Sequence, residues 1–147
     1  MQMPNAYDMI RWMHFLCAAL AAGGMVVCLL VSGFEDTRED LRGLAAVLWS
    51  RVVSWGVRLA LLLGIGMIGW MHKLGGNPFN DYWLWVKLVL VLALAGVSET
   101  APKALAAGKR GGALLALLLV LLASFTVFNR SVFGSRPAAP AAVSSAR

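Results

Sequence analysis

The sequence predicts an all-α, polytopic membrane protein that folds as an antiparallel, up-down-up-down bundle of four transmembrane helices. Hydrophobic residues make up 60% of the 147 residues and the mean hydropathy is +0.75, whereas soluble domains contain about 45–50% apolar residues. Four apolar stretches each approach the roughly 20 residues that cross a hydrocarbon core of about 30 Å. Because the polar connections between them are short, consecutive helices are expected to run in opposite directions.

The first helix is predicted over about residues 10–34 and the second over about residues 44–72. The first stretch is longer than the 7–15 apolar residues of a secretory signal, and it lacks a clearly basic leader because Asp8 offsets Arg11. We therefore expect it to remain as a helix of the mature protein. Residues 35–42 between the two helices are dense in charges of both signs and belong in water.

The third helix is predicted over about residues 83–102 and the fourth over about residues 112–130. Residues 75–78, Gly-Gly-Asn-Pro, are strong turn formers and make a tight connection before the third helix. Residues 137–147 are rich in Ala, Pro and Ser and are expected to be a disordered tail, since they could bury too little apolar area to become ordered. Residues 1–136 then form a single membrane domain.

The net charge of +6 is not interpreted as a nucleic-acid-binding surface. Lys and Arg residues lie mostly in loops and at helix ends, where they set topology and contact anionic lipid headgroups. We expect a lipid bilayer and no nucleic acid as partner. A slight excess of Lys and Arg in the first and third loops favours a cytoplasmic position for these loops. Both termini would then be periplasmic, in a bacterial inner membrane.

Two charged residues inside the predicted helices are expected to form an ion pair. Arg58 lies two turns deeper in the second helix than Arg51, which can reach the interface. An unpaired arginine in a membrane helix is costly, and Glu99 on the third helix is predicted to lie toward the same side. Two interpretations stay open: a structural pair between helices, or a proton or anion relay with Arg58 and Glu99 as catalytic residues.

A second polar group is predicted near the opposite membrane face, where alternating helix direction would bring His14, His72 and Lys87 to similar depth. His14 shares a stripe of small residues that is expected to face the bundle interior. Imidazole is a common haem and metal ligand, so His14 and His72 are candidate cofactor and metal ligands. Lys87 is a candidate partner for a propionate and a candidate catalytic residue. The simpler alternatives are a satisfied core histidine, a wet interfacial histidine and a lysine that extends to the headgroups.

Copper is the alternative cofactor, because soft ligands accompany both histidines. Met25 shares the stripe of His14, Cys17 flanks it, and Met71 precedes His72, a set that suits Cu(I). The chain contains no nucleophile triad, phosphate-binding loop or paired carboxylates, which argues against hydrolytic and phosphotransfer enzymes.

Three short segments, taken in order, resemble a known group. Residues 11–14 read RWMH, residues 21–24 read AAGG and residues 83–88 read WLWVKL. They are similar to the small four-helix membrane proteins that include the HemJ-type protoporphyrinogen oxidase and the CopD-type copper resistance proteins. The likeness to the oxidase implies haem b binding and oxidation of protoporphyrinogen, with His14 and Lys87 at the matching functional positions.

The leading expectation is therefore a small haem b-binding membrane protein in electron transfer or tetrapyrrole oxidation, acting on a tetrapyrrole substrate or with a redox partner protein. His14 would be an axial ligand, His72 a second candidate, and Lys87 would face a propionate. Copper or ion transport and a non-catalytic accessory subunit remain as alternatives. The small-residue stripe of the first helix is also compatible with a homodimer.

Overall fold

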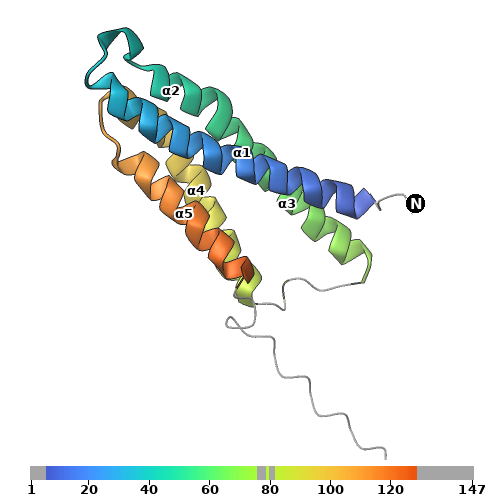
Figure 1. The fold of residues 1–147 in the computed structure, drawn as a ribbon. Coiled ribbons are helices and arrows are strands. Elements are labelled where there is room, and N and C mark those ends of the chain that lie inside the picture. The colour runs from blue at the N-terminus through green and yellow to red at the C-terminus, as the bar shows by residue number, and fades with distance from the viewer. Residues whose placement is uncertain (1–5, 76–78, 80–81, 129–147) are drawn as a thin grey trace, which may run out of the picture.

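The computed structural model describes residues 6–75, 79 and 82–128 (Figure 1). In chain order the elements are α1 (Ala6–Glu35), the 3₁₀ turn η1 (Glu39–Leu41), α2 (Leu44–Leu48), the π-helical turn η2 (Trp49–Val53), α3 (Ser54–Lys73), α4 (Tyr82–Ala106) and α5 (Gly111–Phe128). Every regular element in these ranges is helical. Since α2, η2 and α3 follow one another without a break, the chain forms four main helices, and the predicted fold class is confirmed.

The helices reach close to their predicted bounds, with two differences. α1 begins at Ala6, one turn before the predicted start, and α4 continues to Ala106 although a proline stands at position 102. The predicted end of the fourth helix at 130, the tail at 137–147 and most of the predicted turn at 75–78 lie outside the described residues.

The helices have the length and composition of membrane spans. Three helical stretches are long and apolar enough to cross a bilayer: Ala6–Glu35, Glu39–Lys73 and Tyr82–Ala106. The described part of α5 has 18 residues, which at about 1.5 Å per residue is roughly 27 Å long. The protein is thus a membrane-embedded helical bundle.

α1 packs antiparallel against α3 through small residues. A Cβ atom added to Gly56 would lie 3.1 Å from the Cβ of Ala21, and one added to Gly24 would lie 3.0 Å from a methyl group of Val53. The absence of side chains at these glycines lets the two backbones approach closely. The buried residues of α1 fall on one stripe, Ala21, Met25, Cys28 and Ser32, so the predicted packing face does point into the bundle.

The bundle is tightest at the end that carries the first and third loops. Figure 1 shows α1 and α3 diverging from α4 and α5 toward the amino end of α1. Burial follows the same gradient, because no residue of α3 after Val57 and no residue of α4 before Leu94 is fully buried within the described residues. The α1–α3 pair and the α4–α5 pair therefore meet mainly at one end.

The tight end is fastened by contacts between loops and helix ends. Arg110, ahead of α5, donates to the backbone oxygen of Ser32 at 2.6 Å and pairs with Asp36. Glu35 accepts a hydrogen bond from the backbone N–H of Ala45 at 2.7 Å, which satisfies one of the free donors at the start of α2. Gly43 turns the chain into α2 with a φ of 84°, a conformation that glycine adopts without strain.

Candidate functional sites

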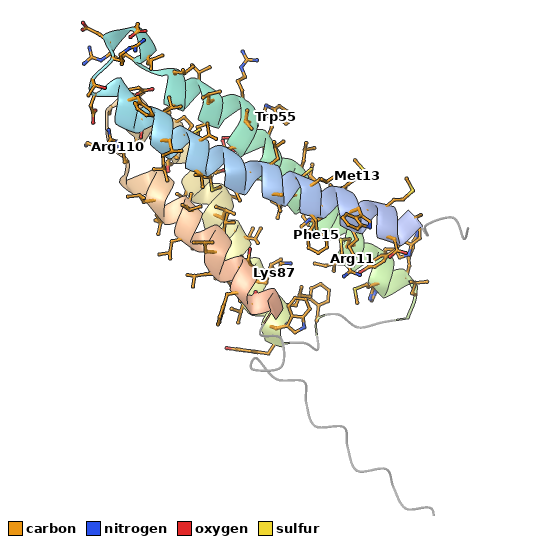
Figure 2. The ribbon with its side chains drawn as sticks, in the orientation of Figure 1. Arg11, Met13, Phe15, Trp55, Lys87 and Arg110 are labelled. Atoms are coloured by element: carbon orange, nitrogen blue, oxygen red, sulfur yellow. The ribbon has the colours of Figure 1, made fainter. Side chains whose placement is uncertain are left out.

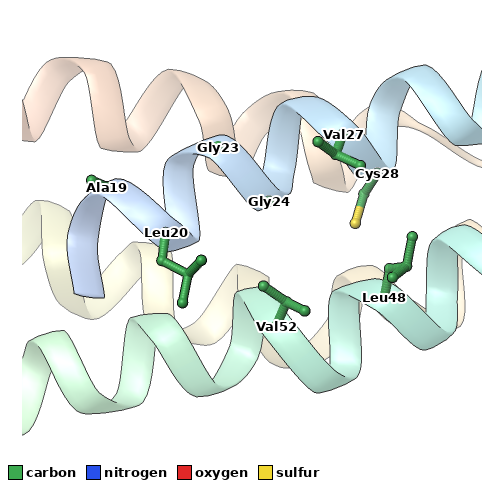
Figure 3. Close-up of a pocket in the computed structure, with 8 residues that line it drawn as sticks. All are labelled: Ala19, Leu20, Gly23, Gly24, Val27, Cys28, Leu48 and Val52. Atoms are coloured by element: carbon green, nitrogen blue, oxygen red, sulfur yellow. The ribbon is translucent and has the colours of Figure 1, made fainter. Parts of the chain in front are cut away.

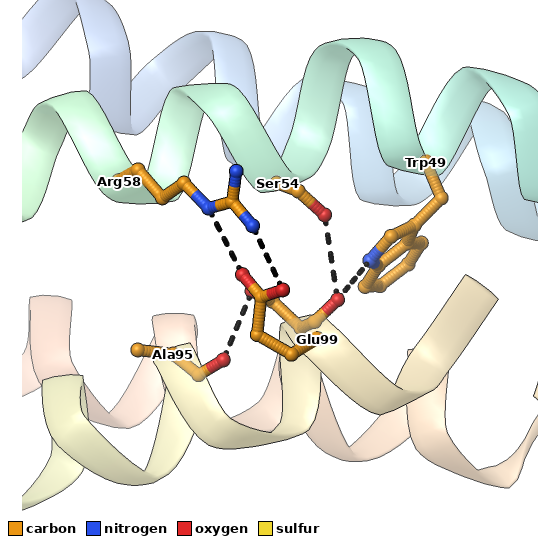
Figure 4. Close-up of polar contacts among 6 residues, drawn as sticks. Trp49, Ser54, Arg58, Ala95 and Glu99 are labelled. Carbon is orange, nitrogen blue, oxygen red and sulfur yellow. Dashed lines mark hydrogen bonds and ion pairs between the residues drawn. The ribbon is translucent and has the colours of Figure 1, made fainter. Parts of the chain in front are cut away.

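A proline inside α4 is accommodated by side chains from the neighbouring helix. Pro102 has no N–H group, so the carbonyl of Ser98 loses the donor that an unbroken helix would supply. Trp49 donates its Nε1–H to this oxygen at 3.0 Å, and Ser54 donates its hydroxyl at 3.4 Å (Figure 4). α4 therefore continues to Ala106, one turn past the predicted end at about 102, because donors distant in sequence replace the missing hydrogen bond.

The π-helical turn η2 explains how two donors reach one oxygen. In a regular α-helix, residues 49 and 54 would point about 140° apart, since each residue turns the chain by about 100°. The wider π turn brings positions five residues apart closer to the same face. Trp49 and Ser54 are both buried, and together they fix α4 at Ser98.

The next residue of α4 belongs to the predicted ion pair. Arg58 binds Glu99 through two parallel contacts, Nε to Oε1 at 3.0 Å and Nη2 to Oε2 at 2.8 Å (Figure 4). The guanidinium carbon of Arg58 lies 5.5 Å from the ring centre of Trp55. The side chains of Arg58 and Glu99 are 49% and 51% exposed, so the pair lies on the outer surface of the bundle.

His14 is held by α3 rather than by another titratable group. Its Nδ1 lies 2.8 Å from the backbone oxygen of Ala60. Because a carbonyl oxygen only accepts, Nδ1 must carry a proton, and in the neutral imidazole Nε2 keeps the lone pair that a metal ligand needs. Gly64 makes room for the ring, since a Cβ there would lie 3.4 Å from Cε1 of His14.

His72 does not converge with His14. It lies 12 residues beyond Ala60 on the same helix, which is about 18 Å at 1.5 Å per residue, and its side chain is exposed. Two histidine nitrogens that bind the same metal ion each lie about 2 Å from it, so His14, held at Ala60, and His72 are too far apart along α3 to share one ion. The predicted equal depth of the two histidines is wrong, because α1 starts two turns before His14 whereas α3 ends one residue after His72.

Lys87 is the member of the predicted His14 site that lies on the opposite helix pair from His14, in α4. It stands in the second turn of α4, half-buried, and points into the space between the two helix pairs (Figure 2). Within residues 6–75, 79 and 82–128, Lys87 makes no hydrogen bond or ion pair.

Arg11 is a further cation near His14 that the sequence analysis did not assign to the site. Its guanidinium carbon lies 5.8 Å from the ring centre of Phe15, and Figure 2 shows both side chains on the lower side of α1. With Asp8 and Trp12 they line an open recess of about 350 Å³. The sequence could have indicated this position of Arg11. In the segment RWMH, Arg11 precedes His14 by three residues, so the two residues lie one turn apart on the helix.

No described contact favours copper. In the described part of the chain no group of three or more His, Cys, Asp or Glu side chains could hold a metal ion. Met25 is completely buried in the apolar core. Cys28 lines an apolar groove of about 330 Å³ between α1 and the α2–η2 segment (Figure 3), lined by Ala19, Leu20, Gly23, Gly24, Val27, Cys28, Leu48 and Val52.

Comparison with protein-family models, with curated proteins and with solved structures finds no match to this chain. The fold and the side-chain contacts define an all-helical membrane protein with two polar groups, the Arg58–Glu99 pair and the surroundings of His14. The similarity to the oxidase and copper resistance group rests on the sequence segments alone.

Proposed function

We propose that the protein binds haem b in the membrane through His14 and uses it in tetrapyrrole oxidation or electron transfer. The observation that carries the proposal is the hydrogen bond from Nδ1 of His14 to Ala60, which leaves Nε2 as the ligating atom. Histidines that bind metals commonly donate their other ring N–H to a backbone carbonyl or carboxylate, which fixes the tautomer and the ring orientation.

The residues around His14 suit a haem that carries two propionates. Lys87 and Arg11 offer positive charges from different helix pairs, and aliphatic side chains of the diverging helices surround them. Haem, when bound, supplies one-electron redox chemistry. The chain itself would provide the iron ligand at Nε2 of His14, a counter-charge at Lys87 and an environment poor in water.

The number of histidine ligands distinguishes between electron transfer and tetrapyrrole oxidation. Since His72 is about 18 Å from Ala60 along α3, it is no longer proposed as a second ligand. Electron-transfer haems commonly have two protein ligands, whereas a haem with one ligand leaves its other side open to chemistry. This favours tetrapyrrole oxidation over electron transfer as the role of the site.

An absorbance spectrum tests the proposal. The protein, purified in mild detergent and supplied with haem, is expected to show a Soret band and reduced α and β bands after dithionite. His14→Ala should lose these bands and His72→Ala should keep them. The absence of a Soret band in the wild-type protein would end the proposal. Stoichiometric copper without haem would favour metal handling, and neither cofactor, with a larger complex co-purifying, would favour an accessory subunit.

We also propose that the first and third loops face the cytoplasm of a bacterial cell and that both termini are periplasmic. The basic residues Arg38, Arg42, Lys109 and Arg110 in these loops support this orientation. A reporter fused after Arg147 should be active only if it functions in the periplasm. Cytoplasmic reporter activity would reverse the orientation.

A further inference from the structure

We propose that the outer face formed by α3 and α4 binds the headgroup of an anionic phospholipid. This α3–α4 face consists of five exposed residues: Arg51, Trp55, Arg58, Glu99 and Lys103. The proposal is independent of haem binding, because none of these five residues is among those proposed to hold haem.

The hydrogen bonds to Ser98 show which residues of the face lie at similar positions along the helix axes. Trp49 and Ser54 both donate to the Ser98 carbonyl, so Arg51, which lies between them in the chain, is level with Ser98. Lys103 follows Ser98 by five residues, about 7.5 Å along α4. Arg51 and Lys103 therefore stand on neighbouring helical segments, two turns before Arg58 and one turn after Glu99 along the chain.

The face lies where the apolar spans begin. A Cβ added to Gly112 would lie 3.7 Å from the Cα of Ala101, so the apolar run of α5 starts at a level between Glu99 and Lys103. The long apolar run of α3 starts at Leu59, directly after Arg58. This is the depth of lipid headgroups on the side of the first and third loops, where tryptophan side chains such as Trp55 are enriched.

The face carries uncompensated positive charge. Arg58 and Glu99 neutralise each other, whereas Arg51 and Lys103 have no hydrogen-bond or ion-pair partner among the described residues. Three cations and one carboxylate leave a net charge of +2. Charges near the hydrocarbon region are stabilised by an opposite charge, so this face favours a negatively charged occupant.

Among the described residues, no acidic side chain of the first loop is free to neutralise this face. The acidic residues of the first loop are already engaged: Glu35 with the N–H of Ala45, Asp36 with Arg110, Glu39 with Arg42 and Asp40 with Arg38. A second copy would present the same net positive charge and be repelled. The carboxyl-terminal residues 129–147 contain arginines and no acidic residue. An anionic phospholipid, in contrast, is available in the bacterial inner membrane proposed above.

Apolar residues continue the face toward the bilayer centre. Leu62, one turn after Arg58 on α3, is 64% exposed, and Leu92, two turns before Glu99 on α4, is 55% exposed. Residues four or seven apart share a side of a helix. A lipid with its phosphate near Arg51 and Lys103 can therefore lay its acyl chains over Leu62 and Leu92.

Native mass spectrometry with mixed lipids tests the assignment. Delipidated protein in detergent is titrated with equal amounts of phosphatidylglycerol and phosphatidylcholine that carry the same acyl chains. The wild-type protein should retain one phosphatidylglycerol with a preference of about tenfold or more. The double variant Arg51→Gln/Lys103→Gln should lose that preference. The double variant Arg42→Gln/Lys109→Gln removes the same charge on the same membrane side and should keep it.

Three results would overturn the proposal: no preference in the wild-type protein, an unchanged preference in Arg51→Gln/Lys103→Gln, or an equal loss in the control variant. Circular dichroism of both double variants checks the fold, and Lys103→Gln alone, with a smaller loss of preference, serves if the double variant does not fold. A photoreactive side chain at position 62 should label phospholipid. Labelling of a second copy or of an acidic protein partner instead would contradict the lipid assignment.

Discussion

At the scale of single residues, the chemistry of His14 is decided by one carbonyl and one glycine. The Ala60 oxygen fixes which nitrogen carries the proton, and Gly64 leaves the ring the space to reach it. The sequence could place His14 on an inward stripe by helical periodicity. It could not identify the hydrogen-bond acceptor, because that depends on how α1 and α3 are aligned.

Gly64→Val is expected to weaken haem binding by displacing the ring of His14. A Cβ at this position would already lie 3.4 Å from Cε1, and two methyl groups beyond it would overlap the ring, a type of overpacking that costs about 1–3 kcal/mol. Gly66→Val is the matched control, since nothing lies within 4 Å of a Cβ there. Haem titration followed at the Soret band should show at least about tenfold weaker binding for Gly64→Val alone. Equal affinities for the two variants would contradict the role of Gly64.

Glu99→Gln separates the two interpretations of the ion pair. If the pair is structural, the substitution lowers the thermal stability of the protein and Arg58→Gln/Glu99→Gln recovers part of the loss. The expected coupling energy is on the order of 1 kcal/mol, because both side chains are half exposed. Thermal unfolding in detergent across the four-variant cycle measures it. Unchanged stability together with lost turnover would instead favour a relay through Glu99.

At the scale of elements, the length and spacing of the apolar stretches predict the four helices. They do not predict the contacts that join the helices. A proline predicts the end of a helix from local geometry, yet α4 passes through Pro102 because Trp49 and Ser54 satisfy Ser98. A π turn interrupts the 3.6-residue period on which the sequence analysis depends. Both features were therefore missed, and both arise from contacts between helices.

Trp49→Phe and Pro102→Ala are expected to be coupled. Trp49→Phe removes the closer of the two donors to the Ser98 carbonyl, at 3.0 Å, and a poorly satisfied buried polar group costs about 1–3 kcal/mol. Pro102→Ala restores a backbone N–H that can bind the same oxygen, so Trp49→Phe should be less damaging in that background. Thermal unfolding of the two single variants and the double variant gives the coupling energy. Strictly additive losses would mean that the indole does not compensate for the proline.

At the scale of the whole molecule, the depth of a residue in the membrane depends on how neighbouring helices are aligned along their axes. The order of the helices in the chain does not determine it alone. Helix order correctly predicts that Arg58 meets Glu99. It fails for His72, because the contact of Gly56 with Ala21 sets an alignment of α1 and α3 that the span lengths do not reveal. The same alignment concentrates the core at one end of the bundle.

Amide hydrogen exchange should reveal this uneven packing. In detergent, residues 58–73 of α3 and 82–93 of α4 are expected to exchange faster than residues 44–57 and 94–106, because only the latter halves contain fully buried residues. Binding of haem at His14 should slow exchange in the faster halves and leave the slower ones unchanged. His14→Ala treated with haem is the control and should show no slowing. Uniform exchange along α3 and α4 would contradict the one-ended core, and slowing in His14→Ala would move the cofactor site away from His14.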